Sequence, residues 1–131
     1  MTSELNELHQ DVYANFVYNW NAVEDHVAGR EAISFADRMG ANYNVGERIA
    51  LVHSEVSEAL EGIRQGDKPD KHLPHRPEGE VELADAVIRI MGIAKVRGYN
   101  LASAIVEKAL YNDVRADHKA KNRSKANGKQ F

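Results

Sequence analysis

All three prolines of this 131-residue chain lie in one stretch, GDKPDKHLPHRPEG, at residues 66–79. Proline breaks the interior of helices and of central strands, so this stretch is expected to be a loop of roughly 14 residues. Its histidines, His72 and His75, are interpreted as exposed side chains. Long loops inside compact domains are often functional. The rest of the chain contains no proline and is free to form long helices.

Apolar residues recur with helical spacing on both sides of this loop. The segment 45–65 before it is predicted to be one amphipathic helix. Its apolar line consists of Ile49, Val52, Val56, Leu60 and Ile63. The segment 80–97 after it is predicted to be a second helix, which is apolar around most of its circumference and ends at Gly98. A helix of this kind is typical of the middle of a bundle or of a subunit interface.

The two ends of the chain also have helical patterns. One or two helices are predicted over residues 4–28, a short helix over 30–39, and a last helix after Asn100, which is a suitable N-cap. The basic residues 119–131 are predicted to form an irregular tail. Nothing in the sequence predicts paired strands. We therefore expect a single all-α domain over residues 1–131, built as a bundle of four or more helices.

Composition excludes several classes of protein. With 43% apolar residues the chain is not of the disordered type. The absence of cysteine excludes disulfides, thiolate zinc sites and cysteine nucleophiles. The chain has neither a secretory signal pattern at its start nor a run of about 18 apolar residues, so we expect a soluble cytoplasmic protein without a membrane partner.

The net charge of −3 is distributed unevenly along the chain. From Glu107 to the end, seven Lys/Arg and three Asp/Glu give +4, so the preceding part carries −7. An acidic body beside a basic end suits a ligand that combines phosphates with metal ions. It equally suits a basic tail that binds nucleic acid.

Two pairs of acidic residues lie on the helices that flank the loop. Glu55 and Glu58 are three residues apart, as are Glu82 and Asp85, so each pair lies on one face of its helix. One such pair is common on a solvated surface. Two pairs on helices that pack antiparallel would bring four carboxylates together beside apolar side chains. Four like charges at this range repel strongly and require cations.

The expected cation is Mg²⁺, with Mn²⁺ as a substitute, because the candidate ligands are hard oxygens without thiolates. A di-iron bundle would need Glu-x-x-His pairs, which the sequence lacks. Arg89, one turn after Asp85, is predicted to orient or screen the carboxylates, and Glu61 to be a surface residue. A carboxylate site for Mg²⁺ is suited to phosphoryl chemistry.

The stretches ALVHSEVSEALEGIRQG and EVELADAVIRIMGIA resemble the MazG-like branch of the all-α nucleoside triphosphate pyrophosphohydrolases. The family pattern is ExxE followed by ExxD, here Glu55 with Glu58 and Glu82 with Asp85. The resemblance implies that these four acids bind Mg²⁺ and that a metal-bound water attacks the nucleotide at its α–β phosphoanhydride. Glu58, together with Glu55, is then the candidate catalytic base. The products would be a nucleoside monophosphate and pyrophosphate.

The resemblance extends to EKALYNDVRADHKAKNRSKANGKQF, which is similar to the family's K-x₃-N-x₂-R ending with a Gly-Lys-aromatic close. It implies that Lys108, Asn112 and Arg115 contact the substrate phosphates. Trp20, in the first predicted helix, is a candidate to stack on the base. The alternative interpretations are a solvated helix face for the first three residues and a core side chain for Trp20.

The resemblance also implies a MazG-like core that is completed by dimerisation, with sites between the subunits of a homodimer or of a dimer of dimers. The predicted activity is thus Mg²⁺-dependent hydrolysis of ordinary or aberrant (deoxy)nucleoside triphosphates. A second hypothesis is a phosphoribosyl-ATP pyrophosphohydrolase, which would use the same metal chemistry on another substrate. A third is a non-catalytic helical module that binds nucleic acid through its basic tail. The two acidic pairs favour the enzyme over a nucleic-acid partner.

Overall fold

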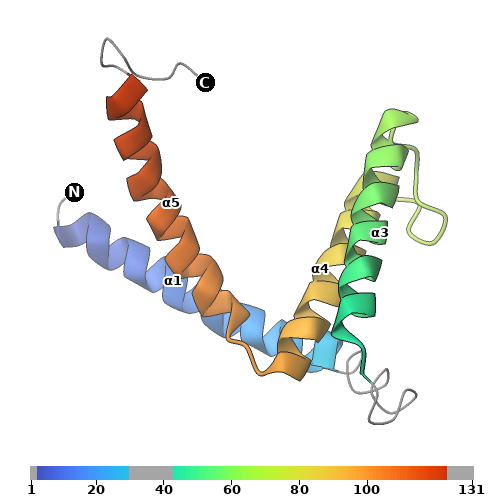
Figure 1. Cartoon of the computed structure of the whole chain (residues 1–131), viewed down its shortest axis with the longest axis horizontal. Helices are drawn as coiled ribbons and strands as arrows, with labels where there is room; N and C mark the ends of the chain where they lie inside the picture. The colour runs from blue at the N-terminus through green and yellow to red at the C-terminus, as the bar shows by residue number, and fades with distance from the viewer. Residues whose placement is uncertain (1–2, 30–42, 124–131) are drawn as a thin grey trace. The chain divides into compact units, whose positions relative to one another are not determined.

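The computed structural model describes the backbone of residues 3–29 and 43–123, and the side chains of residues 9–29 and 43–115. Helices make up most of it. They are α1 (Ser3–Val23), one π-helical turn η1 (Glu24–Ala28), α3 (Val45–Arg64), α4 (Glu78–Arg97) and α5 (Leu101–Arg123) (Figure 1). Within the described ranges there is no strand, so the all-α prediction is confirmed there. In the same ranges, no helix is both long and apolar enough to cross a membrane.

The helix boundaries agree with the sequence analysis at most positions. α5 begins directly after Asn100, whose Oδ1 accepts a hydrogen bond from the Ser103 N–H at 3.2 Å, as an N-cap does. The irregular tail predicted from residue 119 is wrong up to Arg123, because α5 continues to that residue. Alanine and lysine, which are frequent there, are good helix formers. The short helix predicted over 30–39 lies outside the described residues.

The chain divides into two compact units. One consists of Met1–Trp20 together with Asn100–Phe131, and it contains α5 and most of α1. The other is Asn21–Tyr99, which contains η1, α3 and α4. The single domain expected over residues 1–131 stays a prediction.

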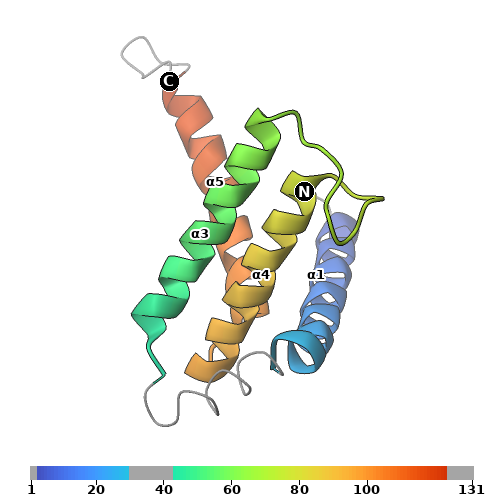
Figure 2. The ribbon, with the colours of Figure 1, turned by 90° about the vertical axis from the view of Figure 1, so that its right-hand side faces the viewer.

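α3 and α4 form an antiparallel hairpin in which the helices lie side by side (Figure 2). The buried residues of the two helices include several small ones, namely Ala59, Gly62, Gly79, Ala86, Gly92 and Ala94. A Cβ atom at Gly79 would lie only 2.7 Å from Cγ1 of Ile63, so no larger residue fits there without a shift. The two backbones therefore approach closely at this end of the hairpin, which determines the side chains that meet further along.

The opposite end of the hairpin is held by η1, which packs on α4. Lys95 of α4 forms an ion pair with Asp25 of η1. α4 ends at Gly98, whose φ of +69° is a left-handed conformation that glycine adopts easily. The Tyr99 N–H donates to the Ala94 carbonyl at 2.9 Å and so satisfies an otherwise open helix end.

The proline loop, residues 65–77, is ordered by its own hydrogen bonds. The carboxylate of Asp70 is buried and accepts two hydrogen bonds, each 2.9 Å long, from the backbone N–H groups two and three residues further on. Asp67 Oδ1 accepts a hydrogen bond from the Gly79 N–H at 2.8 Å, which ties the loop to the first turn of α4. A backbone bridge between Pro69 and Pro77 closes its base. The loop is therefore a fixed element of the hairpin.

Candidate metal centre

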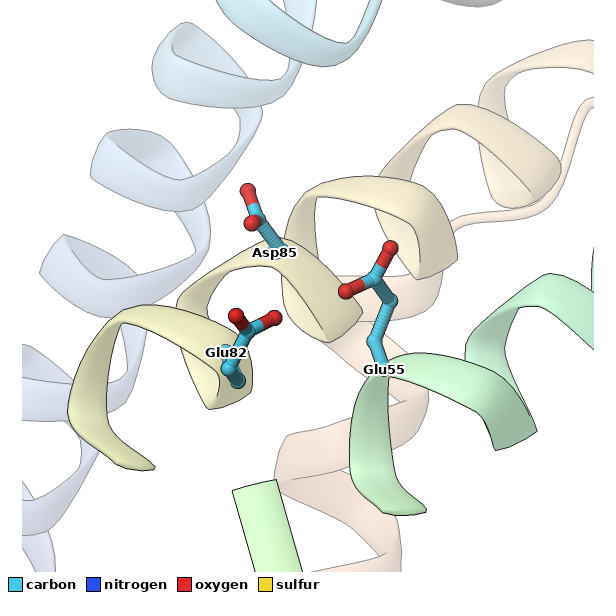
Figure 3. A group of neighbouring side chains, drawn as sticks. All are labelled: Glu55, Glu82 and Asp85. Atoms are coloured by element: carbon cyan, nitrogen blue, oxygen red, sulfur yellow. The ribbon is translucent and has the colours of Figure 1, made fainter. Parts of the chain in front are cut away.

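Three carboxylates from α3 and α4 converge on one point of the hairpin (Figure 3). Glu55 comes from α3, and Glu82 and Asp85 come from neighbouring turns of α4. One oxygen atom of each side chain lies within 4.8 Å of the other two. We call these three residues the acidic cluster. It contains three of the four acids that the sequence analysis proposed as metal ligands.

The fourth proposed ligand, Glu58, borders the acidic cluster without belonging to it. Its carboxyl group hydrogen-bonds with Glu82 and repels it, so the two side chains are neighbours. Glu58 is exposed on α3 and lines a cavity next to the cluster. Glu58 is thus better placed to contact a molecule that is bound to the metal than to bind the metal together with the other three acids.

Glu55 is the anchored member of the acidic cluster. Arg89 Nε donates a hydrogen bond to Glu55 Oε1 at 2.8 Å, and the Glu55 side chain is only 12% exposed. Burial alone would raise the pKa of Glu55, but the hydrogen bond from Arg89, with further hydrogen bonding from Glu82, lowers it below its ordinary 4.5. Glu55 is therefore a carboxylate at neutral pH. Arg89 thus contacts a carboxylate of the cluster, and its predicted role in orienting or screening the carboxylates stays a prediction.

Glu82 has the opposite electrostatic environment. Burial raises the pKa of its carboxyl group, and hydrogen bonding to Glu55 and Glu58 together with repulsion from them brings it to about 7. Near neutral pH the carboxyl group of Glu82 is therefore close to the midpoint of its titration. A cation bound at this point would replace the proton of Glu82 and would relieve the repulsion between the carboxylates.

The donor set of the acidic cluster fits a hard divalent cation. All three donors are carboxylate oxygens, which Mg²⁺ and Mn²⁺ prefer, and neither imidazole nor thiolate belongs to the group. Glu55 and Glu82 are partly buried, whereas Asp85 is exposed, so the cluster opens to solvent on one side. Three protein ligands leave room for water and for phosphate oxygens in the usual six-coordinate shell of Mg²⁺.

A cavity of about 500 Å³ adjoins the acidic cluster. Glu58 and Glu82 belong to its helical wall, and the proline loop forms the opposite wall with Lys68, Lys71 and His72. Neither lysine was predicted as a site residue, whereas the prediction that His72 and His75 are exposed is confirmed. The one signal in the sequence was the position of the lysines in a long loop between the two acidic pairs. That signal did not place them at the site, because only the folded loop brings them against the helices.

The residues proposed to contact substrate phosphates lie on α5, in the other compact unit. Lys108, Asn112 and Arg115 are exposed, and Lys108 Nζ lies 4.6 Å from the centroid of the Tyr111 ring. Their spacing places them on one face of the helix, as predicted. Their role toward phosphates stays a prediction.

The proposed base-stacking residue, Trp20, belongs to the same unit as α5. It is half-buried, and its ring lies 5.6 Å from that of Phe16 at an angle of 43°. This contact is typical of aromatic packing within a helix. The stacking of Trp20 on a substrate base stays a prediction.

Comparison with family models, with curated proteins and with solved structures found no match to this chain. The MazG-like resemblance therefore depends on the residues themselves, and its consequences for function are proposals.

Proposed function

We propose that this protein is a Mg²⁺-dependent nucleotide pyrophosphohydrolase of the MazG-like type, which cleaves nucleoside triphosphates to monophosphates and pyrophosphate. The convergence of Glu55, Glu82 and Asp85 is the observation that supports the proposal most directly. Glu55 of the first acidic pair and both acids of the second pair supply neighbouring oxygens, although they are separated in the sequence. Carboxylates that lie this close repel one another, and a bound cation would relieve that repulsion.

The acids divide into two roles. Glu55, Glu82 and Asp85 would hold Mg²⁺, and Arg89 keeps the Glu55 carboxylate oriented and ionised. When bound, Mg²⁺ supplies charge neutralisation for phosphate oxygens and acidifies coordinated water. Glu58 stands beside this group, next to Glu82, where its carboxylate would serve as the base for the attacking water.

The family pattern also assigns substrate contacts to residues of α1 and α5. Lys108, Asn112 and Arg115 would contact the triphosphate, and Trp20 would stack on the base. Support comes from the exposure of Lys108, Asn112 and Arg115 on one face of α5 and from their family-like spacing. The nucleotide would thus be bound through both its metal-coordinated phosphates and its base.

We further propose that the protein works as a homodimer or as a dimer of dimers, with a MazG-like core that dimerisation completes. Large apolar side chains of the hairpin remain exposed, among them Ile49, Val56, Leu60 and Ile63 on α3 and Leu83 and Val87 on α4. Exposed large apolar side chains in such number are typical of a helix face that packs against a partner. A chain that sediments as a monomer at micromolar concentration would contradict this part of the proposal.

The activity is tested with a panel of nucleoside triphosphates and Mg²⁺, in which pyrophosphate and orthophosphate are measured separately. We expect pyrophosphate as the direct product, and a loss of activity in Glu55→Gln. Glu47→Gln removes the same charge from the exposed start of α3 and should keep full activity. Orthophosphate as the direct product would contradict the proposal.

Two further arms of the experiment distinguish the other hypotheses. Phosphoribosyl-ATP as the preferred substrate would assign the chain to histidine synthesis with the same metal chemistry. Salt-sensitive binding of DNA or RNA without any pyrophosphate release would instead identify a non-catalytic module.

A further inference from the structure

We propose that Lys68 and Lys71 of the proline loop bind the phosphate chain of a metal-complexed nucleotide in the cavity beside the acidic cluster. The inference rests on the proposed function, because it takes the phosphate chain to be bound to a cation at that cluster. It adds a phosphate-binding wall that lies in the same compact unit as the acids.

The shape of the cavity is the first argument. Its volume of about 500 Å³ lies in the range of small-ligand sites. Glu82 belongs both to the acidic cluster and to the cavity lining, so the cavity begins where the cation would bind. A phosphate chain held by that cation can therefore extend from the cluster into the cavity.

The charges of the two walls are the second argument. The helical wall carries Glu58, Glu61, Glu78 and Glu82, and the loop wall carries Lys68, Lys71 and His72 together with Asp70, whose carboxylate is occupied by two backbone N–H groups. No ion pair joins either lysine to a carboxylate within the part of the chain that the structure describes. The acidic side chains of the lining attract a cation and repel a free polyanion. A Mg²⁺–polyphosphate complex presents its metal to the acidic wall and its oxygens to the lysines.

The fixed backbone of the loop is the third argument. The buried carboxylate of Asp70 accepts backbone hydrogen bonds on one side of the loop, and Asp67 is bonded to the first turn of α4 on the other. Lys68 and Lys71 each lie next to one of these anchored aspartates. Their backbone positions are set before a ligand arrives, which reduces the entropy lost on binding.

Inorganic pyrophosphate is a suitable probe, because it is a product of the proposed reaction and carries the phosphate chain without a base. Its binding to the full chain is measured by titration calorimetry, with and without Mg²⁺. We expect binding only with Mg²⁺, and a weakening of about tenfold or more in the double variant Lys68→Ala/Lys71→Ala, because two charge-assisted contacts are lost. The affinity for Mg²⁺ alone should not fall.

Arg64→Ala/Arg97→Ala is the matched control, because it removes two positive charges from exposed positions that do not line the cavity. It should bind pyrophosphate like the unchanged protein. Circular dichroism verifies that both double variants remain helical. Equal weakening in the two would show that net charge, and not the loop wall, determines binding, and would overturn the inference.

Unchanged pyrophosphate binding in Lys68→Ala/Lys71→Ala would also overturn it, as would the absence of pyrophosphate binding by the unchanged protein with Mg²⁺. These outcomes are separable from failure of the proposed function. If pyrophosphate binds with Mg²⁺ through the lysines but no nucleotide is hydrolysed, the phosphate site stands and the activity does not. If nucleotides are hydrolysed and the lysines have no effect on pyrophosphate binding, the activity stands and the phosphate site does not.

Discussion

Asp70 and Glu82 belong to the same hairpin, and both carboxyl groups are at least partly withdrawn from water, yet their surroundings are opposite. Asp70 accepts hydrogen bonds from two backbone N–H groups, which lower its pKa below the ordinary 3.8. Glu82 loses hydration by burial and faces the carboxyl groups of Glu55 and Glu58, and its pKa rises to about 7. One environment favours the charge and the other opposes it.

The difference separates structural acids from candidate functional acids. A carboxylate that is already supplied with N–H donors gains nothing from a cation. A carboxylate that faces other carboxylates is satisfied only by a proton or by a cation. The hydrogen bonds of Asp70 are therefore satisfied within the fold, whereas the acidic cluster is proposed to be satisfied by a bound cation. Substitutions on the two sides should have correspondingly different effects.

Glu82→Gln is expected to have the largest effect. Removal of a direct ligand should lower Mg²⁺-dependent pyrophosphate release by roughly a hundredfold or more, because even residues that only support metal ligands often cost 10- to 100-fold. The same change should raise the melting temperature measured without metal, because it removes repulsion from Glu55 and Glu58. Activity is measured at saturating Mg²⁺, and unfolding by circular dichroism.

Glu47→Gln serves as the control for Glu82→Gln, because Glu47 is exposed in the first turn of α3. Glu47→Gln should change the activity, and the stability measured without metal, much less than Glu82→Gln does. A Glu82→Gln protein that keeps full activity, or one that is less stable without metal, would remove the distinction between the acidic cluster and the loop.

Gly79→Ala is expected to have the next largest effect, on stability. The added methyl group would lie 2.7 Å from Ile63 Cγ1, and such overpacking costs about 1–3 kcal/mol. The free energy of unfolding is measured in urea. In a double-mutant cycle with Ile63→Ala, which removes the contacted atom, the two costs should be clearly less than additive. Additive costs would show that the close approach of α3 and α4 at this point does not limit the packing.

Asp70→Ala tests the other side of the comparison. It removes the acceptor of two backbone hydrogen bonds and should lower the midpoint of urea unfolding, to a smaller extent than Gly79→Ala does. The affinity of the acidic cluster for Mg²⁺, measured by calorimetry, should remain the same, because Asp70 is not one of its members. Asp70→Asn, which keeps a side-chain oxygen acceptor, should recover most of the lost stability. A large loss of Mg²⁺ affinity in either variant would mean that the loop and the cluster are not independent.

Sequence reasoning predicted the hairpin and most of the acidic cluster because both depend on regular repeats. Helical periodicity and the grouped prolines define α3 and α4, and three-residue spacing places Glu82 beside Asp85. The position of Glu58 outside the group of three depends instead on the rotation of α3 about its axis. That rotation is set by close contacts such as the one between Gly79 and Ile63, which no local pattern encodes.

The role of Asp70 was equally inaccessible from the sequence. It is one of two aspartates in a charged, proline-rich loop, and composition alone describes such a residue as solvated. Its burial follows from the closure of the loop by backbone bonds that link residues several positions apart. The lysines of the same loop were missed for the same reason, since their proximity to the acids exists only after closure.

The pH dependence of stability is the most direct measure of the contrast between Asp70 and Glu82. Glu82 has a folded-state pKa of about 7, above its ordinary 4.5, so its contribution is fully present below pH 4.5 and is lost as the pH rises through about 7. Asp70 has a lowered pKa, so its contribution is present above pH 3.8 and is lost as the pH falls below that value. Without metal, the free energy of unfolding should therefore decline from about pH 5 to about pH 8, and this decline should be absent in Glu82→Gln. Saturating Mg²⁺ should reverse it, because the cation binds the deprotonated cluster. If the free energy of unfolding without metal stays constant between about pH 5 and about pH 8, the three carboxyl groups do not repel one another.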